Sequence, residues 1–175
     1  MSRKLAILTI ALAVAALMAP AAFAASATST TNVTLTVAAE AAITAPGTCA
    51  LDTLSAPFGT WSNANACSVT FKVRTTKVGG TGSITALASG DWSGAGGPTL
   101  AGDTLTFTPT ALAGGAGTIG TAGTISTTVP VTAVNFGTDA KTNSGSFSSG
   151  YSLPDNPAWS TGNYSVNVVF TITAN

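Results

Sequence analysis

Residues 31–43 read TNVTLTVAAEAAI, and residues 164–173 read YSVNVVFTIT. In both stretches apolar residues alternate with small ones, and a period of two is the period of a β-strand that buries one face. One face of the first stretch carries Val33, Leu35, Val37, Ala39, Ala41 and Ile43, and one face of the second carries Val166, Val168, Phe170 and Ile172. The sequence therefore predicts a half-buried strand near each end of the chain. These strands either pair with each other, or one of them pairs with a neighbouring molecule.

The segment before the first stretch has the features of a secretion signal. It begins with two basic residues, continues with the apolar residues 5–18, and ends with Ala22-Phe23-Ala24, which fits the small-x-small pattern of a cleavage site. We expect residues 1–24 to be a signal peptide that is removed after Ala24. The mature chain would then be exported. The alternative is that the segment is retained as an N-terminal anchor helix.

The composition favours strands and turns over helices. Charged residues make up 7% of the chain, so the Lys, Glu and Arg that normally cover helix surfaces are scarce. Beyond residue 24 the chain has four basic and six acidic residues, which gives a formal charge of −2. This surface has too few cations to bind a phosphate backbone, so we do not expect nucleic acid as a partner.

The chain has two cysteines, Cys49 and Cys67. In an exported protein an even pair beside predicted strands indicates a disulfide. The bond would close a loop of about 19 residues and stabilise the fold by on the order of 3 kcal/mol. A metal centre needs more ligands than two sulfurs, and the chain has no histidine to add, so we expect no metal and no cofactor.

Short predicted strands recur at regular intervals, separated by runs rich in Gly, Pro and Ser. They are residues 32–43, 51–58, 67–75, 82–88, 104–109, 124–134 and 163–174. This spacing predicts an all-β fold, namely a sandwich of antiparallel strands with Greek-key connections. We expect one sandwich domain at residues 45–175, preceded by an N-terminal strand segment at residues 25–44. No linker separates two blocks that are each large enough for a core.

Several short motifs carry a resemblance to a known family. They are the alternating residues 32–43, Cys49, the segment LSAPFGTW at residues 54–61, the segment CSVTF at residues 67–71, and TGNYSVNVVFTIT at residues 161–173. In these features the chain resembles the spore coat protein U family and the archaic chaperone-usher pilins related to it. The similarity covers nearly all of the mature chain.

The resemblance implies an immunoglobulin-like sandwich that lacks its last strand, so that a donor strand from the next subunit completes it. The implied protein is a subunit of a pilus or surface filament, and its partners are copies of itself in a head-to-tail polymer, a periplasmic chaperone and an outer-membrane usher. The donor residues would be Val33, Leu35, Val37 and Ala39, and the groove or C-terminal strand would hold Val166, Val168, Phe170 and Ile172. The alternative is that residues 32–43 are the first strand of their own sandwich.

The residue types do not favour an enzyme. Without histidine there is no Ser-His or Cys-His nucleophile pair, and the acidic residues lie singly beside turns. A second function stays open, a secreted and self-complete adhesin or carbohydrate-binding module, since sugars stack on aromatic rings. Its candidate rings are Trp61, Trp92, Trp159, Tyr151 and Tyr164. A Ca²⁺ site at Asp52, Asp91 or Asp139 stays open too, although no EF-hand spacing supports it.

Overall fold

The computed structural model describes residues 28–175, so the signal peptide expected at residues 1–24 lies outside the described residues. Contacts divide the chain into two units, one ending at Thr36 and one running from Val37 to Asn175. Residues 28–36, the described part of the first unit, form no strand. The second unit is all β. In the described range no helix is long and apolar enough to span a membrane.

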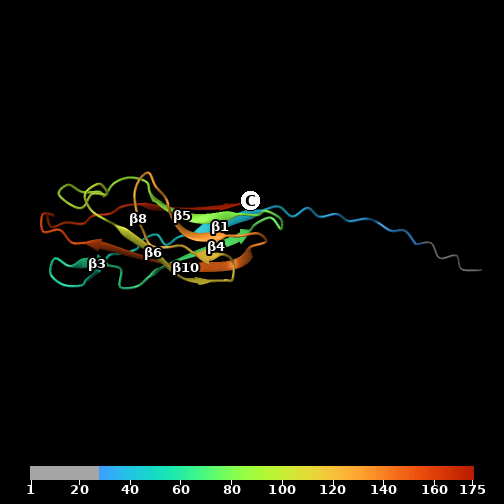
Figure 1. Cartoon of the computed structure of the whole chain (residues 1–175), viewed down its shortest axis with the longest axis horizontal. Coiled ribbons are helices and arrows are strands. Elements are labelled where there is room, and N and C mark those ends of the chain that lie inside the picture. The colour runs from blue at the N-terminus through green and yellow to red at the C-terminus, as the bar shows by residue number, and fades with distance from the viewer. Residues whose placement is uncertain (1–27) are drawn as a thin grey trace, which may run out of the picture. The chain divides into compact units, whose positions relative to one another are not determined.

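The second unit holds two antiparallel sheets that form a sandwich, as the sequence predicts (Figure 1). The first sheet contains β1 (Glu40–Thr44), β2 (Thr53–Leu54), β3 (Thr60–Ser62), β4 (Cys67–Arg74), β6 (Thr106–Ala113), β8 (Gly123–Thr124) and β10 (Lys141–Pro154). The second contains β5 (Gly82–Ala88), β7 (Thr118–Ile119), β9 (Val131–Phe136) and β11 (Val168–Ala174).

β10 organises the first sheet. One edge of β10 pairs first with β4 and then with β3, while the other edge pairs with β6. β1 pairs only with β4, β2 only with β3, and β8 only with β6, so these three strands are the edges of the sheet. The order in the second sheet is β11-β5-β9-β7, with β11 at one edge.

The core lies between the sheets and follows the alternation of β4 and β5. Val69, Phe71 and Val73 of β4 are buried, as are Ile84, Ala86 and Ala88 of β5. Phe107 of β6 and Phe147 of β10 add the largest fully buried rings. β4 and β5 thus bury every second residue, the pattern expected of a sheet with one solvated face.

The longest strand, β10, was not expected from the sequence. Its core face is made of Gly145, Phe147, Ser149, Tyr151 and Leu153, of which only three are large and apolar. The hydroxyl of Ser149 is buried and donates to the carbonyl of Cys67 at 2.9 Å, which satisfies a polar group in the core. Burial raises the pKa of Tyr151 to about 12, so this ring remains neutral over the physiological range. The side chains of β10 therefore alternate between the core and solvent, but the small residues Gly145 and Ser149 at inward positions interrupt the apolar pattern in the sequence.

Five strand predictions need correction. Residues 51–58 hold only the two-residue β2, because the chain turns at Phe58, whose φ is 55°, before β3. Residues 124–134 are broken because the Ser126 hydroxyl accepts from the N–H groups of Thr128 and Val129. β6 begins at Thr106 rather than at 104 and runs to Ala113, and β11 begins only at Val168. Of the strand predicted at 32–43, only Glu40 to Ile43 is strand, within β1.

The predicted disulfide is confirmed. Cys49 is bonded to Cys67, with 6.0 Å between their Cα atoms, and Cys67 is the first residue of β4. The bond therefore ties the segment after β1 to the strand with which β1 pairs.

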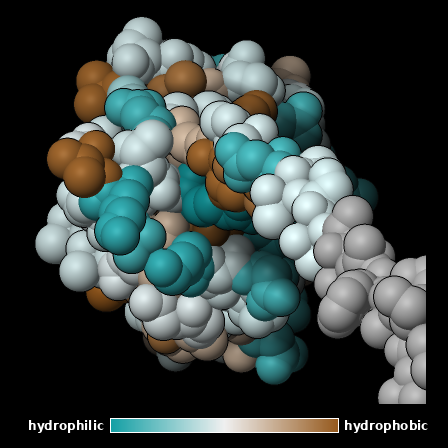
Figure 2. Space-filling view, turned by 90° about the vertical axis from the view of Figure 1, so that its right-hand side faces the viewer, coloured by the Kyte–Doolittle hydropathy of each residue, from teal (hydrophilic) through white to brown (hydrophobic). Residues whose placement is uncertain are grey.

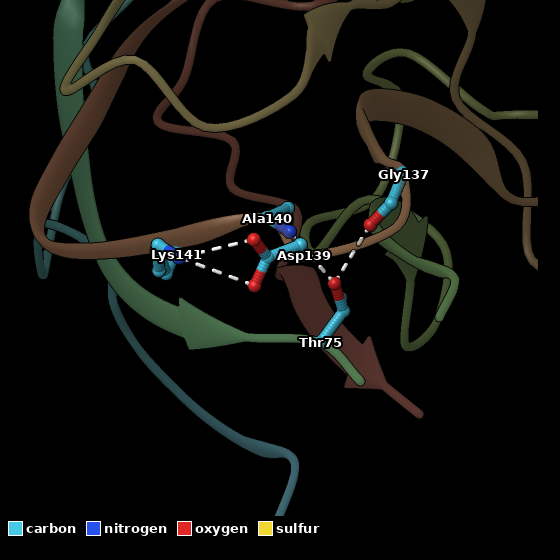
Figure 3. A network of polar contacts seen from close by, with 5 residues as sticks. All are labelled: Thr75, Gly137, Asp139, Ala140 and Lys141. Atoms are coloured by element: carbon cyan, nitrogen blue, oxygen red, sulfur yellow. Dashed lines mark hydrogen bonds and ion pairs between the residues drawn. The ribbon is translucent and has the colours of Figure 1, made fainter. Parts of the chain in front are cut away.

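A buried threonine closes the end of the sandwich where β4 meets β10 (Figure 3). The Thr75 hydroxyl donates to the carbonyl of Gly137 at 2.7 Å and accepts from the N–H of Ala140 at 2.9 Å. The N–H of Thr75 also donates to the carbonyl of Ala140. Thr75 thus fixes the turn between β9 and β10, in which Asp139 pairs with Lys141.

We predict that Thr75→Val lowers the free energy of unfolding by about 2 kcal/mol, because it removes the hydroxyl that bonds the Gly137 carbonyl and the Ala140 N–H in a part-buried site. Urea unfolding should show a lower midpoint with an unchanged slope. Thr138→Val is the matched control, since that hydroxyl makes a 3.4 Å contact with the carbonyl of Gly80 at a more open site. An equal loss in both variants would contradict the assignment.

Candidate functional site

The free edge of β11 is the candidate functional site. β11 pairs with β5 along its whole length, from Val168 opposite Ala88 to Ala174 opposite Gly82. In the described part of the chain no strand pairs with its other edge. An edge strand presents a row of unpaired backbone groups, which is a template for adding another strand.

Two bonds that flank β11 identify which backbone groups are free. The carbonyl of Asn167 accepts from the N–H of Ser89, and the N–H of Asn175 donates to the carbonyl of Thr81. Backbone groups alternate in direction along an antiparallel strand, so the odd-numbered residues of β11 bond to β5. The N–H and C=O groups of the even-numbered residues therefore point to the free edge. These residues are Val168, Phe170, Ile172 and Ala174.

The same four residues turn their side chains toward the core but are only partly buried. Three of their four cross-strand neighbours on β5 are almost fully buried: Ile84 and Ala86 are 0% exposed and Ala88 is 2% exposed. Phe170 is fixed by edge-to-face contacts with Phe107 and Phe147, each with 5.9 Å between ring centroids. Burial of the core thus decreases from β5 to β11, as expected where one side of the core is open.

The neighbouring edge in the other sheet is β1. β1 and β11 come close to each other, but no hydrogen-bonded register joins them. Ile43 of β1 is half-buried and packs against the core. The incompletely covered side of the core therefore lies along β11, next to β1.

The predicted donor residues lie on both sides of the boundary between the two units. Val33 and Leu35 are 87% and 84% exposed, Val37 is 54% exposed, and Ala39 is half-buried. None of the four lies in a strand. Residues 32–37 thus carry an alternating apolar face that is exposed to solvent.

The predicted C-terminal residues are placed together, with one exception. Val168, Phe170 and Ile172 share the inward face of β11, whereas Val166 precedes the strand and packs against the core. Ala174 was not among the predicted residues, although it continues the same period. The alternation from Val166 to Ile172 would have found it if extended by two residues.

The aromatic residues considered for sugar stacking are half-buried. Trp61, Trp92, Trp159 and Tyr151 all pack against the core. Tyr164 packs its ring beside Gly94 and Gly97, and its hydroxyl donates to the carbonyl of Ser160 at 2.5 Å. These rings therefore pack the segments that carry them against the core or against neighbouring loops.

The acidic residues considered for Ca²⁺ lie apart. Asp52 accepts from the N–H of Ala64, Asp91 accepts from the N–H groups of Trp92 and Leu100, and Asp139 pairs with Lys141. Across residues 28–175 no three His, Cys, Asp or Glu side chains gather as metal ligands would.

Comparisons of the chain with family models, curated proteins and solved structures found no match.

Proposed function

We propose that the protein is a structural subunit of an extracellular pilus or surface filament, assembled by donor-strand exchange. Residues 33–39 of one copy add to the free edge of β11 in the next copy. The observation that carries the proposal is the match between two parts of one chain. β11 has an open edge over a partly covered core, and residues 32–37 present an alternating apolar face that no strand of the described chain uses.

Strand addition would supply what β11 lacks. The donor backbone would bond to the free groups of Val168, Phe170, Ile172 and Ala174. Val33, Leu35 and Val37 would leave solvent and cover the core beside Ile43. Each such side chain contributes about 1.5 to 3 kcal/mol when it is buried. Because donor and acceptor lie on different parts of the same chain, the contact is head-to-tail and does not close.

The arrangement of the strands supports the same proposal. One sheet has the order β1-β4-β10-β6, and in the other β11 lies beside β5. We infer an immunoglobulin-like sandwich without its last strand, in which the absent strand would lie along β11. The resemblance to archaic chaperone-usher pilins adds the partners of this proposal, a periplasmic chaperone and an outer-membrane usher. Export through the periplasm follows from the same proposal, and the disulfide is compatible with it.

A synthetic peptide of residues 31–39 tests the proposal on the monomeric fraction of the exported chain. The peptide should slow hydrogen exchange at the amides of Phe170 and Ile172, which point to the free edge, and leave those of Val169 and Thr171 nearly unchanged. The same peptide with Asp in place of Leu35 is the control and should protect neither pair. Absence of protection by the unaltered peptide would overturn donor-strand exchange at β11.

A further inference from the structure

All the basic residues of the sandwich lie at one of its ends, here called the basic end: Lys72, Arg74, Lys77 and Lys141. Arg74 ends β4 and lies opposite Lys141, the first residue of β10. Figure 2 looks onto this end and shows hydrophilic residues around a hollow, which is lined by residues of β1, β4 and β10.

Two carboxylates at the basic end offset only part of its charge. Glu40 pairs with Arg74 at 2.5 Å, and Asp139 pairs with Lys141 at 3.1 Å. Lys72 and Lys77 form no ion pair within residues 28–175. The side chains of the basic end therefore sum to a formal charge of +2.

The other four carboxylates lie at the opposite end, here called the acidic end: Asp52, Asp91, Asp103 and Asp155. Asp155 follows the last residue of β10, Asp91 lies just beyond the end of β5, and Asp103 shortly precedes β6. Asp52 directly precedes β2, which joins β10 through β3 near Leu153.

The acidic end keeps its full charge. Its carboxylates accept hydrogen bonds from backbone N–H groups, as Asp91 does from Leu100 at 2.6 Å and Asp103 from Thr99 at 2.8 Å. These bonds hold the turns but neutralise nothing, and in the described residues none of the four aspartates pairs with Lys or Arg. The formal charge of the acidic end is −4.

We propose that the basic end of one copy docks against the acidic end of the next, so that these two surfaces form the contact between successive subunits. This inference rests on the proposed function and adds the surfaces that meet. Opposite charge on opposite ends suits a head-to-tail chain of identical copies, because every contact then joins unlike charges.

The direction of the strands leads to the same contact. β11 runs from Val168 near the acidic end to Ala174 near the basic end. A donor strand that adds antiparallel, as all the paired strands here do, leaves β11 at the acidic end of the acceptor. The donor chain then continues into β1, which begins at the donor's own basic end with Glu40 opposite Arg74. Parallel addition would instead bring two basic ends together.

The short connection brings these ends within electrostatic range. Val37 is the last large side chain of the donor strand, and only Ala38 and Ala39 lie between it and β1. Three extended steps of about 3.5 Å span roughly 10 Å. That is close to the Debye length of about 8 Å at physiological ionic strength, so the facing charges are only partly screened.

The test measures the rate of polymer formation from monomer by light scattering, at low and at high salt. The variant replaces Asp52, Asp91, Asp103 and Asp155 with Asn, which keeps the side-chain oxygen that accepts from the backbone but removes the charge. Wild-type assembly should slow as salt rises. The variant should assemble about tenfold more slowly at low salt and lose the salt dependence, with the final yield of polymer maintained.

Asp139→Asn is the matched control, because it makes the same change at the basic end. It should assemble as fast as wild type or faster, since it increases the positive charge there. The side chains of the sandwich sum to a formal charge of −2, which the fourfold variant changes to +2. Net charge alone would therefore leave the rate of the fourfold variant nearly unchanged and would speed assembly of Asp139→Asn, so slowing confined to the acidic end supports the contact.

Normal polymer with rates that depend on neither salt nor the four aspartates would overturn the contact and leave donor-strand exchange standing. Failure of the wild-type chain to form any polymer would contradict both proposals. Asp52→Asn alone, with its melting temperature measured, is a second variant that changes a single loop. We expect Asp52→Asn to slow assembly in the same direction as the fourfold variant but by less.

Discussion

Leu35→Asp should abolish the polymer while leaving the sandwich folded. In the single chain Leu35 is 84% exposed and lies in no strand, so the stability of the domain does not depend on it. In a donor strand the same side chain would be buried against the core of a neighbour. The change removes about 1.5 to 3 kcal/mol of apolar burial and adds the cost of desolvating a carboxylate, which is several kcal/mol more.

The measurement is electron microscopy of surface filaments, together with size-exclusion chromatography and the melting temperature of the monomer. Thr34→Asp is the matched control, because Thr34 lies on the opposite face of the same segment and would remain in solvent. It should assemble at nearly normal yield. Normal polymer from Leu35→Asp would refute exchange through this segment, and an unfolded monomer would place Leu35 in the core of its own subunit.

How much of the fold could be predicted depends on which side chains fill the inward positions of each strand. β4 and β5 place large or β-branched residues and alanines at alternate positions, and both were predicted to within one residue. β10 instead places Gly145 and Ser149 on its inward face, so the apolar period is interrupted although the strand is central. The apolar period of a strand is visible in the sequence only where its inward residues are large and apolar, so a strand that buries small residues gives a weak pattern.

The candidate site was predicted in part for a related reason. The alternation in β11 identifies its inward face, so Val168, Phe170 and Ile172 were found. Whether the far edge of β11 has a partner depends on the whole sheet, and no pattern within one strand records it. In the same way, nothing in residues 32–43 indicates that only the part from Glu40 onward pairs with β4.

Gly145, which interrupts the apolar pattern of β10, is also required by the packing around it. Gly145 lies directly opposite Phe71 in β4, and a Cβ atom at this position would meet the Phe71 ring. That ring has little room to move, since it packs against Phe136 with 5.5 Å between ring centroids. A side chain at residue 145 therefore has to displace two packed rings.

We predict that Gly145→Val lowers the free energy of unfolding by about 3 kcal/mol through overpacking. For a chain of this size the melting temperature should fall by about 6 to 12 °C. Gly90→Val is the control, because nothing lies within 4 Å of a Cβ atom there, and its effect should stay within about 0.5 kcal/mol. Adding Phe71→Leu to Gly145→Val should recover part of the loss, since the smaller side chain gives the valine room. Additive losses in that double variant would show that the space beside Phe71 is not what requires glycine in β10.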